Sequence, residues 1–184
     1  METKMMVRLG SAVRKYCQVC LLMVAAFGCN DDDEPKKEEA GVSEVTLNGG
    51  RYTNVIAKTT SAATAVYSPQ DDMTAITYTA MAGDKEFLVV IAFPGKDAGQ
   101  KSWDGENCFA STMQILEDTD ESVMASYYEE GGTLHNGYVK IDKYGQVGGV
   151  VSGTFEGDVT FIDTECACLD AGTMKGTFRA QRIQ

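Results

Sequence analysis

The sequence predicts an all-β protein with one antiparallel domain, a β-sandwich or barrel-like fold of about nine or ten strands. Three observations favour this class. Apolar and polar residues alternate over many short segments, as they do in half-buried strands. Glycine occurs 19 times and proline only 3 times, and glycine-containing turn signals separate the segments. After residue 42, no stretch shows the apolar period of a helix.

The first expected strands, 43–48 and 51–60, flank the hairpin turn signal Gly49-Gly50. Residues 62–68 form a weaker strand pattern, and residues 73–82 alternate clearly between apolar and polar positions. The most apolar run, residues 86–93, predicts a central strand that is covered on both faces.

Residues 95–107 are then expected to form a loop. The segments 108–116 and 122–128 predict two strands around an acidic turn, and residues 129–136 predict another loop. Three final strands complete the domain between Asn136 and Arg182.

Two of those final strands carry the same phrase, Gly-Thr-Phe, at residues 153–155 and 176–178. The alternation around each phrase places Phe155 and Phe178 on buried faces. Opposite charges on the polar faces favour antiparallel pairing of the two strands. The charged residues concerned are Glu156 and Asp158 in the first strand and Lys175 and Arg179 in the second.

Residues 1–28 have the pattern of an export signal, with basic residues followed by a short apolar segment. That segment, 16–28, is shorter than the ~20 apolar residues that a membrane-spanning helix needs. Cys29 follows Ala26-Phe27-Gly28, which resembles a bacterial lipobox, where the cysteine is lipidated and becomes the first mature residue. The several acyl chains of such a lipoprotein hold it firmly in a membrane. The alternative is ordinary signal cleavage after Ala26, which would leave Cys29 as a free thiol.

An acidic run directly follows Cys29 and resembles the surface-export signal of Bacteroidota lipoproteins. The run consists of Asp31, Asp32, Asp33 and Glu34. Its alternative interpretation is a solvated acidic start to a linker. Residues 29–42 have no apolar period and are expected to form a disordered tether between the anchor and a β domain at 43–184.

The last third of the chain adds a second resemblance. The residues that carry it are Gly137, Val139, Ile141, Val151-Ser152-Gly153-Thr154-Phe155, Gly176 and Phe178. This pattern, with the early phrase LNGGRYT, is similar to a group of uncharacterised β-rich surface lipoproteins of Bacteroidota. The resemblance implies the fold and the outer-membrane location, and it implies no activity or catalytic residue. The chain departs from the group in residues 162–172, an expected connection of eleven residues that contains two cysteines.

The formal net charge of -11 at pH 7 excludes nucleic acid as an expected partner, because an acidic protein repels phosphate backbones. The expected contact with a membrane is the lipid anchor at Cys29. Trp103, Tyr127 and Tyr128 could offer an aromatic surface to a glycan or a protein, although packing at the rim of the core is the favoured role.

Three cysteines remain in the expected domain: Cys108, Cys166 and Cys168. In an oxidising compartment we expect one disulfide, with Cys108 bound to Cys166 or Cys168, and direct bonding of Cys166 to Cys168 as the strained alternative. A zinc site that combines the three cysteines with His135 is a weaker alternative, because the spacing matches no common zinc site.

No convincing catalytic constellation is present, and no cofactor is expected. His135 is the one histidine of the chain, and its glycine-flanked surroundings resemble no nucleophile motif. Two acidic clusters could hold calcium, although solvated turns are favoured for both. The clusters are Glu117, Asp118 and Asp120, and Asp163, Glu165 and Asp170.

The sequence therefore predicts an outer-membrane lipoprotein, exposed at the cell surface, that acts by binding or as an envelope component rather than as an enzyme. One alternative is a hydrolase of a small envelope substrate that uses His135 and nearby carboxylates. Another is an accessory subunit that docks on an outer-membrane complex.

Overall fold

The computed structural model describes residues 41–115, 122–127 and 135–184, all within one compact unit, Pro35–Gln184. Every element in this part of the chain is a strand. The strands are β1 (Glu44–Gly49), β2 (Tyr52–Thr59), β3 (Ala63–Ser68), β4 (Met73–Ala82), β5 (Lys85–Pro94), β6 (Gly99–Ser102), β7 (Phe109–Ile115), β8 (Ser122–Ser126), β9 (Gly137–Tyr144), β10 (Val150–Asp163) and β11 (Cys168–Arg182). Across these ranges no helix is long and apolar enough to cross a bilayer.

Eight strands close into an antiparallel ring, which confirms the all-β, barrel-like fold class. In ring order they are β1, β2, β4, β5, β7, β8, β10 and β11. Strand β3 lies between β4 and β11 and pairs in parallel with β11. Strand β9 pairs with β10, and β6 pairs with β9. The short strand β6 lies inside residues 95–107, where a loop was predicted, so that prediction was wrong for residues 99–102.

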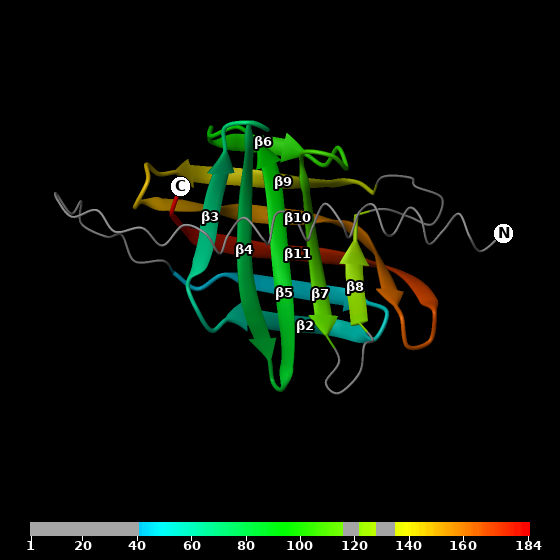
Figure 1. Cartoon of the computed structure of the whole chain (residues 1–184). Helices are drawn as coiled ribbons and strands as arrows, with labels where there is room; N and C mark the ends of the chain where they lie inside the picture. Colours follow the sequence, from blue (N-terminus) through cyan, green and yellow to red (C-terminus); the bar gives the residue numbers. More distant parts are fainter. Residues whose placement is uncertain (1–40, 116–121, 128–134) are drawn as a thin grey trace. The chain divides into compact units, whose positions relative to one another are not determined.

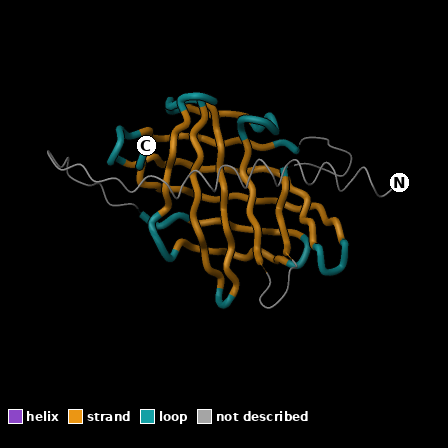
Figure 2. Tube along the Cα trace, viewed as in Figure 1, coloured by secondary structure: helices purple, strands orange, loops and turns teal. Residues whose placement is uncertain are grey.

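The strands form two layers that run crosswise, as in orthogonal sheet packing (Figure 1). One layer contains β3, β4, β5, β7 and β8, and the other contains β2, β1, β11, β10, β9 and β6 (Figure 2). Aromatic side chains join the layers in the core. The ring centroids of Phe93 and Phe178 lie 6.5 Å apart, and those of Tyr52 and Phe87 lie 5.6 Å apart.

The repeated Gly-Thr-Phe phrases form the centre of the hairpin β10–β11. Gly153 lies directly opposite Phe178, and Phe155 lies directly opposite Gly176. Each phenylalanine ring covers the glycine across from it, because a Cβ on Gly153 would meet the Phe178 ring and one on Gly176 would meet the Phe155 ring. Both phenylalanines are buried, as predicted. The repeat is therefore a reciprocal packing device between two strands.

The predicted charge pairing on this hairpin is half right. Glu156 lies opposite Lys175, as expected, but Asp158 lies opposite Thr173. Arg179, the second predicted partner, lies opposite Ser152.

The predicted eleven-residue connection at 162–172 is wrong. Strand β10 continues to Asp163 and β11 begins at Cys168, which leaves a turn of residues 164–167. The composition of this segment is typical of a turn, so the strand residues in it were not predicted. They form strands because β10 also pairs with β8 at residues 160–163. Tertiary pairing overrides local propensity here.

The expectation that residues 86–93 are covered on both faces is also only partly right. Strand β5 is central, between β4 and β7, and Phe87, Val89 and Ile91 face the core with no exposed surface. Leu88 and Val90 on the other face are half-buried. In contrast, the predicted faces of β4 are confirmed, since Ile76, Tyr78 and Ala80 are buried.

Candidate functional site

A row of polar side chains crosses the outer face of the second layer. The strand register places Ser102 of β6 opposite Tyr138, Tyr138 opposite Glu156, Glu156 opposite Lys175, and Lys175 opposite Thr46 of β1. Along each longer strand the residues before and after a member of the row alternate toward the core, so the row faces outward. For β10, for example, Phe155 is buried whereas Glu156 is exposed.

The row and its neighbours enclose a groove of about 440 Å³. Its walls contain four side-chain amides, several hydroxyl groups, two carboxylates and one ammonium group. The lining residues are Thr46, Asn48, Asn54, Gln100, Ser102, Asn136, Gly137, Tyr138, Glu156, Gly157, Asp158, Thr173 and Lys175. Glu156, Asp158 and Lys175 are exposed and give the groove a formal charge of -1. Such a surface offers many hydrogen-bonding groups, and no Val, Leu, Ile, Met or Phe side chain lines it.

Two contacts orient groups within the groove. The hydroxyl of Tyr138 donates a hydrogen bond to Oε2 of Glu156 at 3.2 Å, which holds the ring beside the carboxylate. At the other end, the backbone N–H of Asn54 donates to Oδ1 of Asn48 at 3.4 Å. Asn54 has a φ of 49°, a left-handed conformation that asparagine tolerates better than most residues. The pairing of β1 with β2 is irregular near this point, between Leu47 and Gly49.

Trp103 supports the β9–β10 side of the groove from the core side. A Cβ on Gly137 or Gly157 would overlap the indole ring, so glycine at both positions lets the ring pack directly against the two strands. The backbone N–H of Trp103 also donates to the carbonyl of Gly137 at 2.9 Å. Trp103 is 5% exposed, and its indole Nε1 has no hydrogen-bond partner among the described residues.

The next residue, Asp104, closes the loop that carries Trp103. Its Oδ1 accepts hydrogen bonds from the backbone N–H groups of Glu106, Asn107 and Cys108. Partial burial raises the pKa of Asp104, but these backbone donors outweigh it and leave the pKa below its usual value. The loop conformation is therefore stabilised when Asp104 is ionised.

The predicted role of the aromatic residues in the core is confirmed for two of them. Trp103 and Tyr127 are buried, and Tyr127 stacks on Phe109 with a centroid separation of 4.8 Å. Tyr128 lies outside the described residues. The aromatic residue that lines the groove is Tyr138, which the sequence did not single out.

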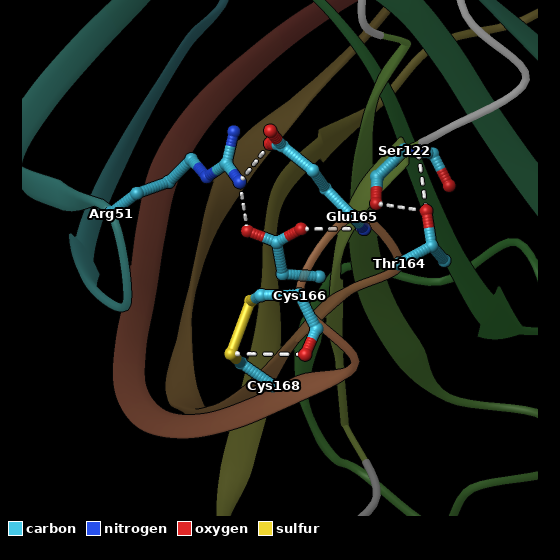
Figure 3. The surroundings of a disulfide bond; sticks show 7 residues. Arg51, Ser122, Thr164, Glu165, Cys166 and Cys168 are labelled. Carbon is cyan, nitrogen blue, oxygen red and sulfur yellow. Dashed lines mark hydrogen bonds and ion pairs between the residues drawn. A yellow bond between two sulfur atoms is a disulfide. The ribbon is translucent and has the colours of Figure 1, made fainter.

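The disulfide joins Cys166 to Cys168 at the tip of the β10–β11 hairpin (Figure 3). The favoured bridge from Cys108 was therefore wrong, and the alternative pairing is the one formed. Cys108 is a free, buried thiol whose Sγ lies 3.6 Å from the carbonyl oxygen of Lys101. It points into the core, whereas Cys166 and Cys168 are exposed. Burial raises the pKa of Cys108 to about 12, so the thiol is neutral at physiological pH.

Arg51 binds two of the acidic residues beside this disulfide. Its guanidinium donates to Oδ2 of Asp163. It also donates, at 2.8 Å, to Oε2 of Glu165 (Figure 3). Hydrogen bonding to Glu165 and then to Asp163 raises the pKa of Arg51, although partial desolvation opposes the shift. Two residues of the expected acidic cluster, Asp163 and Glu165, therefore form ion pairs with Arg51, and the third, Asp170, is exposed.

His135 lies near β10 and not in the wall of the groove. Its Nε2 is 2.9 Å from the hydroxyl of Thr160, and its backbone N–H donates to the carbonyl of Tyr127 at 2.9 Å. The zinc alternative is wrong for this arrangement, because Cys166 and Cys168 bond to each other and Cys108 is in the core. Within ranges 41–115, 122–127 and 135–184, no three His, Cys, Asp or Glu side chains group as a metal site would require.

Several predicted sites lie outside the described residues. They are the lipidation site Cys29, the export run Asp31, Asp32, Asp33 and Glu34, and the acidic cluster Glu117, Asp118 and Asp120. The groove itself was missed because its residues come from six strands, three groups of which (β1 and β2, β6, and β9 to β11) are distant from one another in the sequence. Alternation indicates which side chains face outward, but it does not indicate which strands are neighbours.

Comparison with known proteins adds no relative: no protein-family model, curated protein or solved structure matches the chain.

Proposed function

We propose that this chain is a lipid-anchored protein of the bacterial outer membrane whose β domain binds a ligand at the cell surface. The observation that carries the binding role is the groove of about 440 Å³ on the outer face of β6, β9, β10, β11 and β1. Its walls present hydrogen-bonding groups that the core does not need, since Asn48, Gln100 and Asp158 are all exposed. A concave surface with several convergent polar groups is a typical binding site.

The anchor part of the proposal is supported by the lipobox-like cysteine and the acidic run that follows it. We expect Cys29→Ser to abolish lipid labelling and to release the protein from membranes. Replacement of Asp31, Asp32, Asp33 and Glu34 by alanine should leave the lipid in place but retain the protein on the inner side of the outer membrane. Labelled lipid is measured on the purified chain, and surface exposure by protease treatment of whole cells. A wild-type chain without lipid contradicts the anchor, and unchanged exposure of the tetra-alanine variant contradicts the export signal.

Binding is favoured over hydrolysis by the position of His135. The hydrolase alternative needs this histidine beside a substrate and a nucleophile, because proton transfer requires hydrogen-bond reach. His135 is half-buried, its ring contacts Thr160, and it does not line the groove. We therefore propose a groove that binds without chemical turnover.

Docking on a larger complex receives less support than ligand binding. A docking surface is expected to contain a contiguous apolar patch. The large exposed apolar side chains of the described chain lie on separate segments: Val42, Ile56, Val147, Leu169 and Ile183.

Binding is tested with the full chain, extracted from membranes in detergent and screened against oligosaccharides, peptides and small metabolites by thermal shift. We expect at least one class to stabilise the wild type and to lose this effect in Glu156→Gln and Asn48→Ala. The matched control is Glu86→Gln, an equally conservative change at an exposed glutamate of β5 in the other layer. Binding that is unaffected by the groove variants, or no binding by any class, contradicts the proposed function.

A further inference from the structure

We propose that the groove binds a neutral oligosaccharide, which lies across the strands along the row from Ser102 to Thr46. This inference rests on the proposed binding function and names the class of its ligand. It follows from the dimensions of the row, from the chemistry of the lining side chains and from their charge balance.

The row has the dimensions of an extended chain rather than of a single small molecule. It crosses five neighbouring strands, β6, β9, β10, β11 and β1. Four steps between strands at the usual spacing of about 4.8 Å give a length of roughly 19 Å. The groove follows this direction, since its lining residues come from the same five strands, with Asn54 of β2 and Asn136 at the margins. A ligand that uses the whole row must therefore contain several linked units.

The lining side chains suit sugar hydroxyl groups. A side-chain amide carries a carbonyl acceptor and two N–H donors, and a hydroxyl both donates and accepts. Each sugar hydroxyl also both donates and accepts, so one amide or hydroxyl side chain can satisfy it as a donor and as an acceptor. The groove offers this chemistry at Asn48, Asn54, Gln100, Asn136, Thr46, Ser102 and Thr173. Two carboxylates, Glu156 and Asp158, add strong acceptors for hydroxyl donors.

Tyr138 supplies the apolar surface that a sugar ring needs. It is half-buried on β9, and its hydroxyl is fixed on the carboxylate of Glu156 at 3.2 Å. The ring is therefore oriented before a ligand binds, which lowers the entropic cost of binding. Below it, the Trp103 ring packs against Gly137 and Gly157 and supports the floor of the groove.

The charge and composition of the groove disfavour other ligand classes. Two carboxylates against one ammonium group repel phosphorylated, sulfated or uronic acid ligands. None of the lining residues is Val, Leu, Ile, Met or Phe, so an apolar peptide side chain would find no matching pocket. A peptide that adds a strand would also need a sheet edge, whereas the groove lies on a sheet face.

The test uses the detergent-solubilised full chain and calorimetric titration with linear neutral oligosaccharides of glucose, mannose and xylose, two to seven units long. Oligogalacturonate, a heparin fragment and a random peptide library are the comparison probes. We expect a neutral series to bind, with an affinity that rises with chain length and then becomes constant once the row is filled. Glu156→Gln and Asn48→Ala should each weaken binding by about tenfold, because the first replaces a charged acceptor by a weaker neutral one and the second removes a side-chain amide. Glu86→Gln should leave the affinity unchanged.

Failure of this inference is distinct from failure of the proposed function. If an anionic glycan or a peptide binds and the groove variants weaken that binding, the groove is a binding site but the neutral oligosaccharide is wrong. If neutral oligosaccharides bind with equal affinity to the wild type and to both groove variants, the assigned site is wrong. If no probe binds, both the inference and the proposed function are overturned. A thermal melt of each variant confirms that loss of binding does not reflect loss of folding.

Discussion

The substitution Phe155→Ala measures how strongly the reciprocal Gly-Thr-Phe packing stabilises the domain. The Phe155 side chain is 1% exposed, and its ring covers Gly176 on the neighbouring strand. Removal of the ring leaves a cavity beside a residue that has no side chain to fill it. Deletion of a buried phenylalanine side chain costs about 3–5 kcal/mol, and the glycine opposite places the expected cost in the upper half of that range. Typical stabilities are about 5–15 kcal/mol, so the variant would be close to unfolding at 37 °C.

The assay is urea unfolding of the full chain, followed by the fluorescence of Trp103, the one tryptophan in the sequence. A matched control is Phe109→Ala, which removes the same side chain from a half-buried position that stacks on Tyr127. We expect this control to lose clearly less stability than Phe155→Ala. A similar loss in both variants, or a loss below about 1 kcal/mol for Phe155→Ala, would refute the reciprocal packing as a major source of stability.

Three further predictions concern the hairpin tip, the core and the floor of the groove. Joint replacement of Cys166 and Cys168 by serine should lower the free energy of unfolding by only about 1–2 kcal/mol, because the loop that the bridge closes is very short; non-reducing peptide mapping checks the pairing, and a link to another cysteine would contradict it. Burial raises the pKa of Tyr52 to about 12, above its usual 10.0, so this residue should stabilise the fold below pH 10 and lose that contribution as the pH rises toward 12; alkaline unfolding curves combined with absorbance titration test the sign. Gly157→Ala should cost about 1–3 kcal/mol through contact with Trp103, and a double-mutant cycle with Trp103→Leu should show coupling above about 0.5 kcal/mol; additive effects would contradict the contact.

The sequence predicted the parts of the fold in which local alternation and burial agree. Strand β4 alternates without interruption, and its predicted faces are confirmed. The burial of Phe155 and Phe178 on paired antiparallel strands was also predicted, because both residues lie in the same repeated pattern. Elements with a weak local signal were missed. Strand β6 contains Gly, Gln, Lys and Ser, which carry no apolar period, and it forms only because β9 offers a free edge.

The cysteine prediction failed for a different reason. Loop-closure arguments favour long-range bridges, but they contain no information on which way a side chain points. Cys108 directly precedes β7 and is buried in the core, whereas the other two cysteines are exposed at a turn that is shorter than predicted. The disulfide prediction assumed a long connection at 162–172, so the error in the length of that connection led to the error in the cysteine pairing.

The groove was beyond prediction because it depends on strand order. Glu156 and Lys175 could be paired from the sequence, since they lie in one hairpin. Thr46 and Ser102 join the same row only because β1 pairs with β11 and β6 pairs with β9. No local pattern encodes these neighbours, which are set by the order of the strands in the whole sheet.

The most direct test of the binding groove is carboxyl footprinting of the full chain by mass spectrometry, with and without a saturating neutral oligosaccharide. Glu156 and Asp158 line the groove, and Glu86 is an exposed internal control on the opposite layer. We predict that the ligand strongly slows the chemical labelling of Glu156 and Asp158 and leaves the labelling of Glu86 unchanged. Equal labelling of Glu156 in the free and ligand-saturated protein would contradict the assignment of the groove as the binding site.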